Sequence, residues 1–235
     1  MFVLEKNPNP IQIHDGSNVF ELMDLVGDAR LLILAVGVPG SGKSTILGEM
    51  KRILEEHYGL CPAICDLDDR QSKFWKIPSI LQYVLPRRIF RYLVSKKIVD
   101  PGGSDEAMQT TWKWILDQIS RDSKDPIIVC DAGPNYWMRF QLVSAAKAVV
   151  AARNNEKAKL AEWNMPEERF HIHQVFINCP WWLAFFRNLM RERVVHLKPF
   201  FNAVRGVKSA SRKMLQYCDS WGIVENGWKS HRKDA

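Results

Sequence analysis

The stretch that most constrains this chain is a glycine-rich turn between an apolar run and a helix-forming segment. It reads LLILAVGVPGSGKST over Leu31–Thr45. Four residues match the spacing G-x-x-x-x-G-K-[ST] of a phosphate-binding loop: Gly37, Gly42, Lys43 and Ser44. Leu31–Val36 carries no charge, as expected of a strand buried in a parallel sheet. Such glycines let backbone N–H groups surround a phosphate, and the dipole of the following helix favours an anion there. The sequence therefore predicts a phosphate-binding loop.

The chemistry of this loop predicts ATP and Mg²⁺ as ligands. Seven residues are expected to bind the phosphates: Gly37, Gly40, Ser41, Gly42, Lys43, Ser44 and Thr45. Lys43 is expected to reach the β- and γ-phosphates, and the Ser44 hydroxyl to ligate Mg²⁺. The alternative is an ordinary glycine-rich strand–helix turn, which needs neither the lysine nor the Ser-Thr pair that follows it.

Apolar runs that alternate with helical patterns predict an α/β fold. After Leu31–Val36, we expect further strands near Cys61–Cys65, Pro126–Cys130, His171–Asn178 and Gly222–Val224, which make about five parallel strands with flanking helices. A length of 235 residues suits a single domain over 1–235. Within it we expect an N-terminal elaboration (1–29), a helical acceptor-binding insertion (71–125) and an arginine-bearing lid region (181–213).

The composition argues against a membrane or secreted protein. No run of eighteen apolar residues occurs, and the N-terminal sequence lacks the pattern of a signal peptide. The five cysteines are odd in number and scattered, which suits a reducing compartment. We therefore expect a cytoplasmic protein without a membrane partner. His171 and His173 lack companions at metal-ligand spacing, so we expect them on the surface or in the core.

Polar residues follow the predicted strands, at the edge where open α/β sheets bind ligands. The second strand is followed by three carboxylates and an arginine: Asp66, Asp68, Asp69 and Arg70. A carboxylate there can accept the proton of an attacking hydroxyl, and the arginine can hold a substrate phosphate. The alternative is a cluster that caps a helix N-terminus. The third strand ends at Asp131, which suits either an Mg²⁺ ligand or a second helix cap or a substrate contact.

The segment after the fourth strand, WWLAFFRNLMRER over Trp181–Arg193, is expected to form the lid. Arg187 and Arg191 are four residues apart and share one helix face, from which they could neutralise the transferred phosphoryl group. The aromatic side chains of Trp181, Trp182, Phe185 and Phe186 are expected to dock this segment on the protein. The alternative is a solvated basic face.

The charge distribution suggests a polyanionic partner. The net charge is +7, and Arg70–Val99 holds eight basic residues, no acidic residue and several aromatic residues. A polymer acceptor needs such a stretch because its phosphates must be held and its bases can stack on rings. Arg87, Arg88 and Arg91 are the expected phosphate contacts. The alternatives are a solvated helix face with its aromatics in the core, or a nucleic-acid surface elsewhere, such as Arg205–Lys213.

Four segments together resemble the kinase domain of bacteriophage 5′-hydroxyl polynucleotide kinases. They are Val36–Thr45, Asp68–Ser72, Ile127–Asn135 with Arg139 beyond it, and His173–Arg193. The resemblance implies a general base and a substrate-phosphate arginine from a DD-x-R element. Here the spacing is DD-R, so we assign the base to Asp68 and leave Asp66 and Asp69 as alternatives, with Arg70 on substrate phosphate. It also implies lid arginines at Arg187 and Arg191, with Arg191 as the catalytic one.

The function predicted from residues and resemblance is transfer of the γ-phosphoryl group of ATP to a hydroxyl on nucleic acid, with DNA favoured over RNA. The acceptor would be a 5′-hydroxyl or a hydroxymethyl group on a base such as 5-hydroxymethyluracil. Two alternatives stay open. One is a P-loop kinase of a small metabolite or nucleotide-sugar, similar to zeta toxins, and the other is a nucleic-acid-binding P-loop protein without catalysis.

Overall fold

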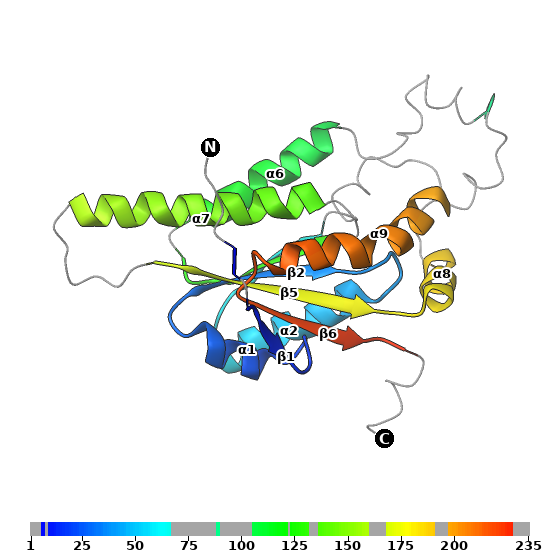
Figure 1. Cartoon of the computed structure of the whole chain (residues 1–235), viewed down its shortest axis with the longest axis horizontal. Helices are drawn as coiled ribbons and strands as arrows, with labels where there is room; N and C mark the ends of the chain where they lie inside the picture. The colour runs from blue at the N-terminus through cyan, green and yellow to red at the C-terminus, as the bar shows by residue number, and fades with distance from the viewer. Residues whose placement is uncertain are drawn as a thin grey trace.

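The computed structural model describes residues 6–7, 9–66, 88–89, 105–121, 123–131, 136–159, 168–190 and 197–227. Six strands form one sheet in the order β1-β6-β5-β2-β4-β3, and every neighbouring pair is parallel (Figure 1). The strands are β1 (Ile11–Ile13), β2 (Arg30–Val36), β3 (Ala63–Asp66), β4 (Ile127–Asp131), β5 (Phe170–Asn178) and β6 (Ser220–Glu225). The predicted α/β fold with a parallel sheet is confirmed.

The sheet has one strand more than the roughly five predicted. The extra strand, β1, lies at the sheet edge beside β6 and comes from the segment assigned to the N-terminal elaboration. A strand of three residues is too short to give an alternating or apolar run, so the sequence pattern did not reveal it.

Helices cover both faces of the sheet. They are α1 (Val19–Val26), α2 (Lys43–Tyr58), α6 (Asp105–Ser120), α7 (Tyr136–Lys159), α8 (Trp181–Leu189) and α9 (Leu197–Leu215). Figure 1 shows α6, α7 and α9 over one face, α1 and α2 over the other, and α8 beyond the carboxyl ends of the strands. Within the described residues, no helix has the length and apolar composition that crossing a membrane requires.

The central strand β2 is buried along its whole length and divides the core into two layers. Leu32 and Leu34 join the apolar cluster that contains Leu142 of α7, whereas Leu31, Ile33 and Ala35 join the cluster that contains Leu47 of α2. Side chains alternate across a strand, so an unbroken apolar run is what a strand covered on both faces requires. This burial fixes β2, and therefore the loop that follows it.

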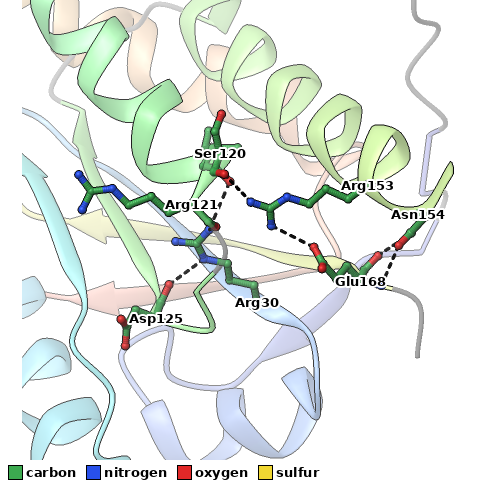
Figure 2. A network of polar contacts seen from close by, with 8 residues as sticks. Arg30, Ser120, Arg121, Asp125, Arg153, Asn154 and Glu168 are labelled. Carbon is green, nitrogen blue, oxygen red and sulfur yellow. Dashed lines mark hydrogen bonds and ion pairs between the residues drawn. The ribbon is translucent and has the colours of Figure 1, made fainter. Parts of the chain in front are cut away.

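Arg30 joins four elements at the amino end of the sheet (Figure 2). Its Nε donates to the Asp125 carbonyl at 2.9 Å, and its Nη1 donates to the carbonyls of Ile119 and Arg121 at 3.3 and 3.0 Å. The guanidinium also lies 5.4 Å from the ring centroid of Phe170 in β5. A cation beside the last carbonyls of α6 is favourable because these carbonyls have no partner within the helix. Arg30 therefore ties β2 to α6, β4 and β5.

A second part of this network joins α7 to β5. The Arg153 guanidinium pairs with the Glu168 carboxylate at 3.0 Å and donates to the Ser120 carbonyl. Asn154 and Glu168 exchange two hydrogen bonds of 2.9 and 3.0 Å, from the Asn154 amide to the Glu168 carbonyl and from the Glu168 N–H to the Asn154 side chain. Figure 2 shows these contacts between the end of α6, α7 and the residues before β5.

Arg30→Met is expected to lower the free energy of unfolding by about 2 kcal/mol, since methionine keeps most of the buried stem but removes the three hydrogen bonds to the Asp125, Ile119 and Arg121 carbonyls. Denaturant titration of the variant checks this value. The exposed Arg121, paired only with Asp117 four residues earlier, offers a control, and Arg121→Met should change stability little. Equal stabilities of the Arg30 and Arg121 variants would contradict a structural role for Arg30.

His173 connects β5 to the turn before α1. Its Nδ1 lies 2.8 Å from the Ser220 hydroxyl, and its Nε2 lies 3.3 Å from the Gly16 carbonyl. His171 contacts the same hydroxyl at 2.7 Å. Burial lowers the pKa of His173 to about 4, helped by the nearby His171 and opposed by the Gly16 carbonyl. Burial also lowers the pKa of His171, which Asp219 raises and Arg169 lowers. His173 is thus a neutral core residue, as one of the two expectations had it.

The His173 pKa predicts a loss of stability in mild acid. The unfolded chain binds a proton near pH 6.5, whereas the folded chain binds it only near pH 4. Stability should therefore be complete above pH 6.5 and fall as the pH drops toward 4, by about 2 kcal/mol between pH 7 and pH 5. Denaturant titrations at both pH values measure this change. His173→Gln should flatten the dependence, while exposed His14→Gln should preserve it, and the same slope in both variants would contradict the assignment.

Candidate functional site

The glycine-rich loop lies at the point where the strand order of the sheet reverses. β2 lies between β4 and β5 in the sheet. After β2 and α2, the chain forms β3 and β4 on one side of β2, and it later forms β5 on the other side. Ligands of open α/β sheets bind at the carboxyl ends of the strands at such a point. The predicted strand–loop–helix context of the motif is therefore present.

Two glycines in the loop have backbone conformations that other residues rarely adopt. Gly40 has φ 81° and Gly42 has φ 89°, both in the left-handed region. A Cβ atom at Gly40 would lie 2.2 Å from the Ala184 carbonyl oxygen of α8. One at Gly42 would lie 2.2 Å from Nδ2 of Asn226. Both positions thus combine a positive φ with a close approach, which explains the motif glycine at residue 42 and the additional glycine at residue 40.

The Lys43 side chain folds back over the loop. Its Nζ donates to the carbonyls of Gly37 and Val38 at 2.9 and 3.0 Å, and the residue is only 6% exposed. Lys43 is also the first residue of α2, whose N-terminal N–H groups have no partners within the helix. The Lys43 ammonium and the N-terminus of α2 therefore lie together at the loop, which is the arrangement that attracts a phosphate.

The loop contains a buried hydroxyl group that a bound phosphate could satisfy. The Ser41 hydroxyl is fully buried, and among the described residues it has no hydrogen-bond partner. A Cβ on Gly37 would lie 2.6 Å from this oxygen, so the hydroxyl can take this position only because residue 37 is glycine. A buried hydroxyl without a partner is costly unless a ligand or water satisfies it. Ser44 and Thr45, at the start of α2, have exposed side chains.

Helix α8 packs directly on this loop. Ala184 of α8 contacts the loop at Gly40 and belongs to the same apolar cluster as Val36, Val38 and Phe200. The buried side of α8 consists of Leu183, Ala184 and Asn188. The expectation that the aromatic side chains dock this helix was therefore wrong for Trp181, Trp182 and Phe186, which are 53%, 46% and 57% exposed. Small residues let α8 approach the loop backbone, which bulky rings would prevent.

Arg187 is the predicted lid arginine that the structure places at the loop. Its Nη1 lies 4.0 Å from the position of a Cβ on Gly42, and it contacts the Cys179 sulfur at 3.9 Å. Burial raises the pKa of the Cys179 thiol, although the Arg187 guanidinium opposes this shift. Cys179 therefore stays a neutral thiol at pH 7, and the positive charge of Arg187 is available to an anion.

Asn226 is a site residue that the sequence did not indicate. Its Nδ2 donates to the Ser41 carbonyl at 2.6 Å, and its backbone N–H donates to the Asn178 carbonyl at 2.9 Å. It thus connects the ends of β5 and β6 to the glycine-rich loop. A cavity of about 460 Å³ opens beside it, lined by Gly42, Thr45, Ile46, Arg187, Val224, Glu225 and Asn226. This volume lies within the range of about 300–1,000 Å³ that is typical of pockets for small ligands.

The strand register brings two predicted carboxylates to the same edge as the loop. Asp131 pairs with Val36, the residue before Gly37, and Asp66 pairs with Cys130 on the next strand. Their backbone positions are therefore side by side at the carboxyl ends of β3, β4 and β2. The orientation of these two side chains lies outside what the structure describes, so the Mg²⁺ role of Asp131 stays a prediction.

The remaining predicted residues are not assembled at the loop by the described structure. Arg88 is exposed. Arg139, in the first turn of α7, is 1% exposed and is close enough to Cys218 to lower its pKa, which burial raises to about 12. Several residues lie outside the described part of the chain: Asp68, Asp69, Arg70, Arg87, Arg91 and Arg191. Most of the predicted acceptor-binding insertion lies outside it as well.

No protein-family model matches this chain, and no curated protein matches it. Among solved structures, one similar chain is described as a sugar kinase from Janibacter sp., in an unliganded structure. The two chains share 13% identity with a TM-score of 0.37, over 84% of this chain and 85% of that chain. The fold assignment therefore rests on the strand order and loop geometry of this chain itself.

Proposed function

We propose that this chain is a kinase that transfers the γ-phosphoryl group of ATP to a hydroxyl group on nucleic acid, DNA rather than RNA. The observation that carries the kinase part is the loop itself. Gly40 and Gly42 hold its backbone open, and the ammonium of Lys43 lies at its centre. The buried Ser41 hydroxyl has no partner among the described residues, which suits a ligand oxygen in the loop.

The cavity between Gly42 and Asn226 offers room for the nucleoside part of ATP. It borders the first turn of α2, so a phosphate chain that enters the loop could have its nucleoside in this cavity. Ile46 and Val224 supply apolar surface, and Asn226 supplies an amide. Thr45, Arg187 and Glu225 are further polar lining residues, and small-molecule sites combine apolar surface with such polar groups, which fix the orientation of a ligand.

Different residues of this chain would bind the phosphates, accept the proton and hold the metal ion during phosphoryl transfer. Lys43 and the loop N–H groups would hold the phosphates, and Arg187 would offset charge as the bond to the bridging oxygen breaks. A carboxylate, assigned to Asp68, would take the proton of the acceptor hydroxyl as its oxygen bonds to phosphorus. Ser44 and Asp131 would hold Mg²⁺, which when bound neutralises charge on the phosphates. The α8 helix would exclude water, a competing acceptor.

The nucleic-acid part of the proposal is supported by charge. The chain carries a net charge of +7, and its longest stretch without acidic residues, Arg70–Val99, follows the proposed base. A small-metabolite acceptor has no need of so long a cationic stretch, whereas a polymer acceptor must have its flanking phosphates held.

A transfer assay with ATP labelled at the γ-phosphate tests this function. The acceptors are single-stranded oligonucleotides with a free 5′-hydroxyl, a duplex that contains 5-hydroxymethyluracil and has blocked ends, and a mixture of sugars and nucleosides. Label on either nucleic acid supports the proposal and identifies the hydroxyl. Label only on a small molecule would make the chain a metabolite kinase. No transfer to any acceptor, with ATP bound, would leave a binding protein.

A further inference from the structure

The outer side of α8 presents an aromatic surface that the loop does not use. Trp182 and Phe186 are four residues apart on one helix face, and both are about half exposed. Trp181, 53% exposed, lies with its ring centroid 6.2 Å from that of Phe201 in α9, which is 39% exposed. Phe185 links the two groups, since its ring centroid lies 6.2 Å from that of Phe186 and 6.3 Å from that of Phe201. The rings therefore form a continuous surface across two helices.

A line of positive charge continues from this surface along α9. Phe201, Arg205 and Arg212 are four and seven residues apart, so they lie on one face of the helix. Both arginines are exposed. Phe201 and Arg212 are separated by about 16 Å along the helix axis, at 1.5 Å per residue. The whole of α9 holds five basic residues and no acidic residue. The exposed face thus has rings at one end and cations along the rest.

We propose that this ring-and-arginine surface of α8 and α9 binds single-stranded nucleic acid. Unpaired bases would stack on Trp181, Trp182, Phe186 and Phe201, and the sugar–phosphate backbone would follow Arg205 and Arg212. Every base has a π-face that an exposed ring can cover, so such a surface binds strands of any sequence. Because the cations lie in a line beside the rings, they match a chain of phosphates that runs beside its bases.

The charge of this surface and the arrangement of its residues favour single-stranded nucleic acid over a second copy of the chain and over a membrane. A second copy of the chain would bring two α9 faces with the same positive charge together, which repel. A membrane surface is anionic as well, but helices that lie in it carry cations on the face opposite their apolar residues. Here Arg205 and Arg212 share the face of Phe201.

The surface also lies close to the phosphate-binding loop. Its helix α8 contacts the loop at Gly40, and a helix with its side chains is about 10–12 Å across, so a strand on the outer side of α8 is within reach of the site. This link to catalysis rests on the proposed function, but binding to the surface does not. Lys43 lies on the other side of α8, so Lys43→Ala should leave strand binding unchanged.

Fluorescence anisotropy with a labelled oligothymidylate, titrated with the full chain at several salt concentrations, tests the proposal. The wild type should bind. The double variant Trp182→Ala with Phe186→Ala should bind about tenfold more weakly or worse, because stacking is lost. Trp182→Phe with Phe186→Tyr keeps two rings and should restore most of the affinity. Arg205→Ala with Arg212→Ala should lower the log–log salt slope by about 1.4, from two phosphate contacts on a single strand.

Matched controls separate this surface from general effects. Phe20→Ala removes a ring of similar exposure from α1, on the opposite face of the sheet, and should not alter binding. Lys113→Ala with Lys124→Ala removes the same charge from exposed positions in and after α6 and should leave the slope unchanged. Thermal unfolding confirms that each variant is folded.

Three results would overturn the proposal. The first is that the ring variant and the arginine variant bind the oligonucleotide with the same affinity as the wild type. The second is binding to vesicles of phosphatidylcholine and phosphatidylserine without binding to the oligonucleotide. The third is a dimer in solution that the ring variant abolishes. A Lys43→Ala variant that binds the strand but transfers no phosphoryl group would keep the surface and the proposed function distinguishable.

Discussion

Lys43→Ala is expected to reduce phosphoryl transfer by several hundred-fold, which corresponds to about 3–4 kcal/mol of lost transition-state stabilisation. In the structure its ammonium contacts the Gly37 and Val38 carbonyls at the centre of the loop, where the phosphates of ATP would be. The variant should stay folded, because the substitution removes the buried ammonium itself and so leaves no buried charge without a partner. The transfer assay measures the rate, and thermal unfolding measures the fold.

Lys51→Ala is the matched control on the same helix. Lys51 lies two turns further along α2, where it is exposed and pairs with Glu55 at 3.4 Å. Exposed pairs of this kind contribute little, so neither transfer nor stability should change appreciably. A folded Lys43→Ala protein with the transfer rate of the wild type would refute the kinase proposal as a whole.

Gly40→Ala is expected to abolish ATP binding and to lower the free energy of unfolding by about 4 kcal/mol. The new methyl group would meet the Ala184 carbonyl at 2.2 Å, and residue 40 has φ 81°. Strain at a positive φ and overpacking each cost about 1–3 kcal/mol, and neither α8 nor the loop can shift without breaking their contact. Calorimetric titration with ATP and denaturant titration measure the two effects.

Gly48→Ala makes the same chemical change at a position where we expect higher stability and normal ATP binding. Gly48 lies within α2, and nothing lies within 4 Å of the position that its Cβ would occupy. Alanine favours a helix interior over glycine by up to about 1 kcal/mol, so this variant should be more stable than the wild type and bind ATP normally. If both variants bound ATP alike, the packing of α8 on the loop would have no bearing on the site.

The glycine-rich loop and the five strands other than β1 could be predicted because their signals are local. The motif glycines, the lysine and the uncharged run before them fix one strand–loop–helix unit, and the cap at Gly59 marks the end of its helix. The burial of β2 on both faces follows from its unbroken apolar run. The position of Arg187 beside the loop also agrees with its place after the fourth predicted strand.

The prediction from sequence was wrong for the aromatic residues of α8, because such residues can be either buried against the protein or exposed. An amphipathic pattern with four aromatic residues predicted that these rings dock the lid helix. The structure instead packs Ala184 on the loop, because only a small side chain allows the helix backbone to approach Gly40. The exposed rings then become a surface of their own. Periodicity identifies the faces of a helix, but the closeness of the neighbour decides which face is buried.

The sequence by itself determined a glycine-rich strand–loop–helix unit, a parallel sheet and an excess of positive charge. These follow from residue types at fixed short spacings, which act through local backbone geometry. Only the tertiary structure decided that β1 closes the sheet edge, that His173 reaches Gly16, and that Asn226 holds the Ser41 carbonyl. Each of these contacts joins residues more than 150 positions apart, and no spacing pattern carries information over that distance because the intervening fold sets it.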